Sequence, residues 1–155
     1  PLTGRRILLL GAGGAARGVI GPILEQHPEM LVIANRTASK ASALATLFAS
    51  LGPVSGCGFS GLAGSRFDVV INATSASLSG DVPPLPAGIF ANGAMAYDMM
   101  YGKGDTPSLA HARQLGVPQL ADGRGMLVEQ AAEVFFVWRG VRPDSLPVLD
   151  KLRHA

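Results

Sequence analysis

The sequence lacks the features that define secreted and membrane-embedded proteins. It contains a single cysteine, Cys57, among 155 residues, so no disulfide can form within the chain, and a reducing compartment such as the cytoplasm is expected. The sequence lacks an apolar run of the ~18 residues that a membrane-spanning helix needs, and its first residues do not have a signal-peptide pattern. We therefore expect no role at a membrane.

Charged residues are also scarce, at 15% of the chain, and they form no lysine or arginine run. The net charge of +2 and the isoelectric point of about 9.1 are weak grounds for a nucleic-acid partner, so none is expected. The three histidines show no metal-ligand spacing, and no metal site is expected. With 48% hydrophobic residues, the composition is that of one domain with a packed core.

A glycine-rich turn near the start of the chain carries the clearest motif. Ile7–Leu10 has the pattern of a buried strand, Gly11–Ala16 reads G-A-G-G-A-A, and a helical apolar pattern follows. This is the dinucleotide-binding fingerprint G-x-G-x-x-G/A, in which Gly11 permits the tight turn and Gly13 lets the backbone approach a pyrophosphate. The helix N-terminus then offers free N–H groups to the phosphates. The alternative is an ordinary glycine turn without a ligand.

Strand and helix patterns alternate along the rest of the chain. This alternation predicts an α/β fold, a doubly wound Rossmann-type parallel sheet of six strands in the order 3-2-1-4-5-6 with helices on both faces. Strands are expected at Ile7–Leu10, Met30–Ala34, Val54–Cys57, Phe67–Ile71, Ala94–Asp98 and Val117–Leu120. Helices are expected at Ala15–Gln26, Ala38–Leu51, Pro107–Leu115, Gly123–Trp138 and Leu146–Arg153.

Polar and glycine-rich residues follow most of these strands, where a doubly wound sheet binds its ligands. An NAD-binding domain usually carries an acidic residue after the second strand, but here Asn35 and Arg36 stand there, and no carboxylate follows until Asp68. Arg36 can bind a 2′-phosphate through paired hydrogen bonds, with Lys40 one helical turn further on. The sequence therefore favours NADP over NAD. Alternatively, the two cations belong to a solvated helix face.

Five motifs occur in an order and at a spacing that resemble the NADP-binding C-terminal domain of the shikimate dehydrogenase family. They lie at residues 11–18, 35–40, 72–75, 97–101 and 122–130. This family reduces 3-dehydroshikimate to shikimate with NADPH, in the route to chorismate and the aromatic amino acids. The resemblance implies that residues 1–155 form one NADP-binding domain. Its helices from about 123 to 155 would pack toward an N-terminal substrate domain that is missing, with Pro1–Gly4 as a linker remnant.

The resemblance also implies roles for single residues. The pyrophosphate loop would be formed by Ala12, Gly13, Gly14, Ala15 and Ala16. The adenosine 2′-phosphate would be held by Asn35, Arg36, Thr37 and Lys40. The nicotinamide ribose would lie along Thr74 and Ser75, and the nicotinamide between Met99, Gly123 and Met126. The substrate would face Tyr101 and Gln130.

Other roles are open to several of these residues. The methionines could simply fill gaps in the core, Gln130 could be a surface residue, and Tyr101 could be a rim aromatic. Many family members carry a proline where this chain has Lys103, so that segment could be looser or could place a cation near the site.

The family's catalytic lysine–aspartate pair belongs to the missing N-terminal domain. No catalytic residue is therefore expected here, and shikimate or 3-dehydroshikimate would bind only together with that domain. The apolar helices at the C-terminal end would be left uncovered, which predicts a homodimer or other self-association. Three alternatives stay open: a quinate/shikimate dehydrogenase, another two-domain NADP oxidoreductase such as methylenetetrahydrofolate dehydrogenase, and a non-catalytic nucleotide-sensing module.

Overall fold

A computed structural model of the chain describes residues 1–76 and 80–153. Six strands form one sheet in the order β3-β2-β1-β4-β5-β6, and every neighbouring pair is parallel. The predicted doubly wound topology is thus confirmed. The strands are β1 (Arg6–Leu10), β2 (Met30–Ala34), β3 (Val54–Cys57), β4 (Phe67–Asn72), β5 (Phe90–Asp98) and β6 (Gln119–Ala121).

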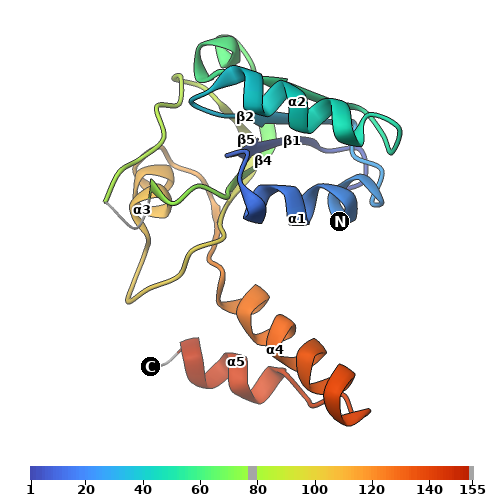
Figure 1. Cartoon of the computed structure of the whole chain (residues 1–155). Coiled ribbons are helices and arrows are strands. Elements are labelled where there is room, and N and C mark those ends of the chain that lie inside the picture. The colour runs from blue at the N-terminus through green and yellow to red at the C-terminus, as the bar shows by residue number, and fades with distance from the viewer. Residues whose placement is uncertain (77–79, 154–155) are drawn as a thin grey trace.

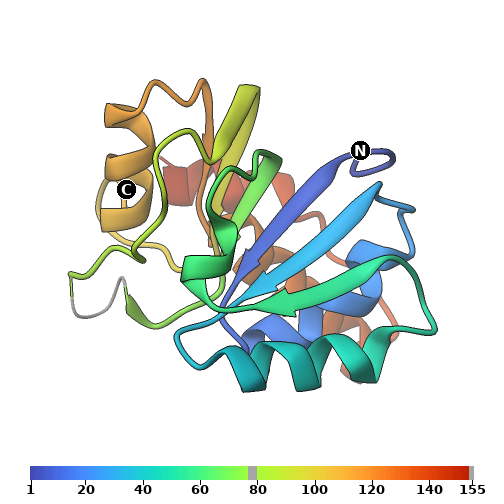
Figure 2. The same ribbon diagram turned by 90° about the horizontal axis from the view of Figure 1, so that it is seen from above.

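Helices cover both faces of this sheet (Figure 2). The helices are α1 (Gly14–Leu24), α2 (Ala38–Phe48), η1 (Phe59–Leu62), α3 (Pro107–Gln114), α4 (Arg124–Arg139) and α5 (Leu146–Arg153). Helices α1 and α2 pack on one face of β1 and its neighbours, and the short 3-10 helix η1 and α3 lie on the other face.

The central strand β1 is buried on both faces, as its run of apolar residues predicts. Ile7 and Leu9 pack with α1 and α2, whereas Leu8 and Leu10 pack with η1 and the segment before β5. Successive side chains of a strand point to opposite faces, so one short strand supplies the middle of two separate hydrophobic clusters. This double burial fixes the position of the turn that follows β1.

Helix α2 lies unusually close to strand β3, at a position where a side chain would not fit. A Cβ atom added to Gly56 would lie 2.3 Å from both the carbonyl carbon and the carbonyl oxygen of Ala41. Such a distance is well inside van der Waals contact, and the atoms concerned belong to the backbone of the helix. Gly56 therefore allows α2 to pack directly on the sheet.

The observed elements differ from the expected ones mainly at their ends. Strand β5 begins at Phe90 rather than Ala94, because Phe90 pairs with Phe67 before the pairing register shifts. Gly93, with φ of +75°, lies between the Phe90 pair and the Met95 pair, where the register shifts. A glycine in a strand interior is a sign of such an irregularity. The other ends coincide with the expected ones or differ by at most three residues. Residues 77–79 of the loop before β5 lie outside the described part.

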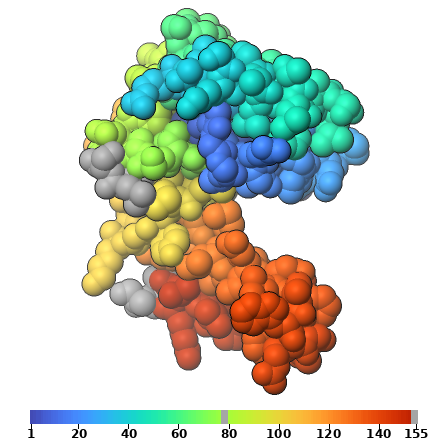
Figure 3. Space-filling model, viewed as in Figure 1, coloured from blue at the N-terminus to red at the C-terminus, as the bar shows by residue number. Residues whose placement is uncertain are grey.

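Helices α4 and α5 form a hairpin that extends away from the layers around the sheet (Figure 1). In the space-filling view it is a distinct lobe (Figure 3). Gly140 ends α4 in the left-handed conformation, and Arg142 then forms an ion pair with Glu133 while its guanidinium lies 5.2 Å from the centre of the Phe136 ring. Large apolar side chains remain exposed on this hairpin, including Trp138 at 81%.

No helix in the described part of the chain combines the length and the apolar character needed to cross a membrane.

The packing of α2 on β3 yields a stability prediction. Gly56→Ala should lower the free energy of unfolding by about 1–3 kcal/mol, because the new methyl group would press on the α2 backbone. Chemical denaturation followed by circular dichroism measures this difference. The matched control is Gly21→Ala in α1, where a Cβ has nothing within 4 Å. It should stabilise the chain by about 0.5–1 kcal/mol, since alanine favours helix over glycine. An unchanged stability of Gly56→Ala would contradict this account of the packing.

Candidate functional site

The carboxyl ends of the inner strands are joined by backbone hydrogen bonds that continue beyond the strands themselves. The Gly11 N–H donates to the Ala34 carbonyl oxygen at 2.8 Å, and the Ala73 N–H donates to the Leu10 carbonyl oxygen at 2.9 Å. The residues after β1, β2 and β4 are therefore held side by side. In doubly wound sheets ligands bind at this edge.

The glycines of the turn after β1 are needed for different reasons. Gly11 has φ of +107°, and a Cβ there would lie 3.1 Å from the Ala73 carbonyl oxygen, so the fold itself requires glycine at this position. Gly13 and Gly14 are exposed, and a Cβ at either would meet nothing within 4 Å. The protein's own packing therefore does not explain these two glycines.

The start of helix α1 suits an anion. Its N-cap is Gly13, which has no side chain to accept a hydrogen bond from the N–H groups of the first turn. The turn holds no acidic residue, so nothing there repels a negative charge. Uncapped N–H groups and the positive end of the helix dipole together form a site that favours phosphate.

This turn opens into a cleft of about 570 Å³ along the carboxyl edge of the sheet. The cleft brings together most of the residues predicted for the pyrophosphate, the 2′-phosphate and the nicotinamide ribose. Of those, Gly11, Ala12, Gly13, Gly14, Ala15, Asn35, Arg36, Thr74 and Ser75 line it. Ala16 lies beneath the cleft, fully buried in the core, where its small side chain lets α1 approach the sheet.

The segment after β2 presents Arg36 to the cleft. Arg36 is exposed, and the Asn35 side-chain amide donates to the Thr37 carbonyl oxygen at 3.1 Å, which shapes the turn before α2. Thr37 is the N-cap of α2, although its hydroxyl does not accept the capping hydrogen bond. Lys40 is exposed on the first turn of α2 and does not line the cleft.

Two parts of the cleft wall were not among the predicted site residues. Phe59 opens η1 directly after β3, and Asp81–Pro84 lie in the loop that follows β4. Both segments follow the carboxyl end of a strand, and this position in the sequence is what could have identified them as parts of the cleft. The structure thus adds an aromatic face and a carboxylate, Asp81, to the cleft.

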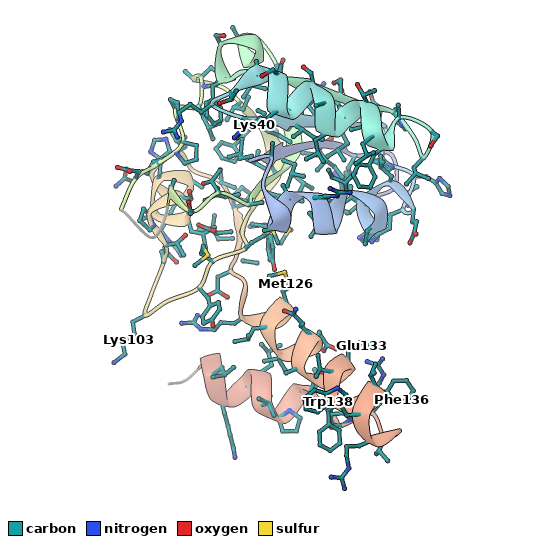
Figure 4. All side chains as sticks on the ribbon, in the orientation of Figure 1. Lys40, Lys103, Met126, Glu133, Phe136 and Trp138 are labelled. Carbon is teal, nitrogen blue, oxygen red and sulfur yellow. The ribbon has the colours of Figure 1, made fainter. Side chains whose placement is uncertain are left out.

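The residues predicted around the nicotinamide lie elsewhere in the structure. Met99 and Met126 line a second hollow of about 230 Å³ between β5, α1 and the start of α4. Figure 4 shows Met126 on the first turn of α4, pointing toward the main body. Gly123 is buried, its N–H donates to the Met100 carbonyl oxygen at 3.0 Å, and a Cβ there would lie 2.1 Å from the Met99 carbonyl oxygen. Gly123 therefore allows α4 to start against the end of β5.

Tyr101 and Gln130, predicted to face the substrate, are both exposed, Tyr101 at 48%. The loop that carries Tyr101 is connected to α4, because the Arg124 guanidinium donates a hydrogen bond to the Gly102 carbonyl oxygen. The same guanidinium donates to the Asp122 carboxylate at 2.7 Å. Lys103 lies at the outer tip of this loop and points away from the protein (Figure 4).

Tyr97 is a group near the site whose pKa is altered by its surroundings. It follows the buried Ala96 on β5 and is packed against the core beside Met99. Burial raises the pKa of the Tyr97 phenol, and the negative charges of Asp122 and Asp98 raise that pKa further. The phenol is therefore neutral at physiological pH.

The described residues include no cluster of side chains that could hold a metal ion.

Comparison with known proteins adds to this geometry. The family model described as shikimate / quinate 5-dehydrogenase matches residues 1–79. The chain is 64% identical to the shikimate dehydrogenase (NADP(+)) of Dechloromonas aromatica over 152 residues, which are 98% of this chain and 56% of that protein. The chain thus spans little more than half the length of this relative.

Two solved structures resemble the chain over 98% of its length. An Ael1 enzyme from Pseudomonas putida superposes with a TM-score of 0.86 at 54% identity, and the match covers 56% of that chain. The ligand-free 5-ketofructose reductase of a Gluconobacter strain superposes with a TM-score of 0.80 at 31% identity, and the match covers 57% of that chain.

The raised pKa of Tyr97 predicts how stability depends on alkaline pH. Above pH 10.0, the ordinary value for a tyrosine, the unfolded chain loses the phenol proton before the folded protein does. The contribution of Tyr97 to stability is therefore complete below that pH and is lost as pH rises through the folded-state pKa. Denaturation midpoints measured from about pH 8 to 11 should fall more steeply for the wild type than for Tyr97→Phe. Parallel curves would count against the prediction.

Proposed function

The chain belongs to the shikimate / quinate 5-dehydrogenase family, and we propose that it is the NADP-binding domain of a shikimate dehydrogenase. One observation carries the proposal: the exposed glycine turn, the uncapped start of α1 and the Arg36 side chain all line the same cleft. The phosphates and the adenosine of a dinucleotide need those groups at one site.

The residues of the cleft fit NADP rather than NAD. The open space over Gly13 and Gly14 allows a pyrophosphate to approach the backbone N–H groups at the start of α1. Arg36, just after the neighbouring strand β2, would then bind the 2′-phosphate. No carboxylate stands after β2 to bind a ribose 2′-hydroxyl in its place. The relative from Dechloromonas aromatica is named for NADP(+), which supports the same cofactor here.

The reaction would need groups from outside this chain. Bound NADPH supplies a hydride for the reduction of 3-dehydroshikimate to shikimate, and this chain would bind and orient it. Thr74 and Ser75 would lie along the nicotinamide ribose, Met99, Gly123 and Met126 around the nicotinamide, and Tyr101 and Gln130 toward the substrate. The proton donor would come from the part of the relatives that lies outside the match, so we expect the chain alone to be inactive.

A second candidate keeps the cofactor and changes the substrate. The 5-ketofructose reductase shares the fold over nearly the whole chain, so the same fold occurs in a protein named for a different substrate. A quinate/shikimate dehydrogenase fits the same cleft, but the arginine after β2 disfavours its NAD-preferring members. A non-catalytic nucleotide-sensing module would keep the glycine turn and would not need Tyr101 and Gln130.

The cofactor assignment predicts a difference between the two dinucleotides. In calorimetric titrations the chain should bind NADP more tightly than NAD. Arg36→Asp should weaken NADP binding by about 2 kcal/mol or more, because a charge-assisted contact becomes a repulsion, and should narrow the gap between the two cofactors. The matched control is Arg66→Asp, an exposed residue before β4 at the opposite end of the strand. Equal binding of NADP and NAD by the wild type would overturn the assignment.

We also propose that the chain self-associates through the exposed apolar side of the α4–α5 hairpin. Val137, Trp138 and Val141 are each more than 60% exposed on one small lobe, where they are available to a second copy. Figure 4 shows Trp138 and Phe136 near the far end of α4.

Light scattering tests the self-association. The mass should exceed the monomer value of 16.0 kDa and rise with concentration. Trp138→Glu should return the mass toward that of the monomer, because a carboxylate in an apolar contact must be desolvated. Leu47→Glu, which places the same charge on an exposed apolar residue of α2, is the control and should leave the mass unchanged. A wild-type monomer at high concentration would exclude the proposal.

A further inference from the structure

The polar side chains that are buried in the described part of the chain gather in one place. They are Asn72 at 3% exposure, Asp98 at 0% and Thr106 at 7%, and they belong to the end of β4, the end of β5 and the N-cap of α3. Burying a polar group costs free energy unless the group is hydrogen-bonded. These three side chains lie together at the edge of the sheet where the ligand is expected.

Asp98 is the centre of this cluster. Its Oδ2 atom accepts a hydrogen bond from the Thr106 hydroxyl at 2.6 Å and another from the Asn72 side-chain amide at 3.3 Å. Its Oδ1 atom accepts from the Met100 N–H at 3.0 Å. All three partners are donors, and a carboxylate accepts at both oxygens, so its chemistry matches the three.

On one side the cluster reaches the wall of the cleft. The Asn72 amide oxygen accepts hydrogen bonds from the Thr74 hydroxyl at 2.7 Å and from the Thr74 N–H at 3.1 Å. Thr74 lines the cleft, and its hydroxyl in turn accepts from the Ala76 N–H at 3.3 Å. The conformation of residues 72–76 thus depends on how Asn72 is oriented. The N–H₂ group of the Asn72 amide donates to Asp98 and, at 2.9 Å, to the Ser108 hydroxyl on α3.

On the other side the cluster controls the turn after β5. Asp98 holds the Met100 N–H, and the Met100 carbonyl oxygen accepts from the Gly123 N–H at 3.0 Å. The same carboxylate therefore orients both Thr74 and the Met99–Met100 segment. It touches neither the cleft nor the second hollow itself.

We propose that Asp98 is a positioning residue for the nicotinamide half of the dinucleotide. This inference rests on the proposed function, in which Thr74 lies along the nicotinamide ribose and Met99 and Gly123 lie at the nicotinamide. Asp98 positions Thr74 through Asn72, and it positions the turn after β5 through the Met100 N–H. The adenosine half, bound at Arg36 and the start of α1, is independent of it.

The division of the site into two halves gives a direct test. Adenosine 2′,5′-bisphosphate carries the 2′-phosphate and lacks the nicotinamide ribose. Asp98→Asn replaces one acceptor oxygen by an N–H₂ donor that faces other donors, so it should weaken NADP binding about tenfold and leave the binding of the bisphosphate unchanged. Asp105→Asn, which removes an exposed carboxylate paired with Arg113, is the control and should change neither.

Thr106 provides variants that remain informative if Asp98→Asn does not fold. Thr106→Val removes the donor at 2.6 Å and should also weaken NADP selectively, whereas Thr106→Ser retains the hydroxyl and should restore wild-type binding. Thr106 does not line the cleft. Its hydroxyl also accepts from the Leu109 N–H at 3.4 Å as the N-cap of α3, so the bisphosphate titration is needed to detect a general loss of structure in Thr106→Val.

The possible outcomes separate the two proposals. Selective loss of NADP affinity in Asp98→Asn or Thr106→Val, with serine rescue, supports the inference. Equal loss for NADP and the bisphosphate indicates a general structural role for Asp98 and overturns it, as does unchanged binding of both. Failure of the wild type to bind either compound would instead overturn the proposed function.

Discussion

The site depends on one constraint, that all six strands are parallel and therefore end at the same edge. Backbone hydrogen bonds beyond the strands, such as those from Gly11 to Ala34 and from Ala73 to Leu10, hold the turns after β1, β2 and β4 together. Arg36 and Ala73 lie 25 and 62 positions after Gly11 in the sequence, and all three thereby share one cleft. No local motif could bring them together, because each turn by itself supplies only one wall.

Most of the fold could be predicted from the sequence because local patterns and long-range pairing agree. The apolar run Ile7–Leu10 is buried on both faces, and the strand order follows from the alternation of strands and helices. The early start of β5 could not be predicted, since Phe90–Gly93 contain an asparagine and a glycine and pair only because Phe67 lies beside Phe90. Such pairing is a tertiary effect that overrides local propensity.

The site was predictable to the extent that it belongs to the sheet. Nine residues named from the sequence line the cleft, because a glycine turn or a strand end fixes their positions. Phe59 and Asp81 lie in segments whose course depends on the packing of η1 and of the loop after β4, and no motif marks them. The cluster around Asp98 could not be predicted either, because nothing in the sequence around Asp98 shows that its carboxylate is buried.

Gly11 and Gly13, in the turn after β1, show how a structure separates the needs of folding from the needs of a ligand. Gly11 has a positive φ and a close backbone neighbour, so folding alone explains it. Gly13 has an ordinary extended conformation and open space where a side chain would be, and folding leaves it unexplained. A residue whose small size serves no intramolecular contact is best explained by something outside the chain. The uncapped start of α1 beside Gly13 indicates that this partner is an anion.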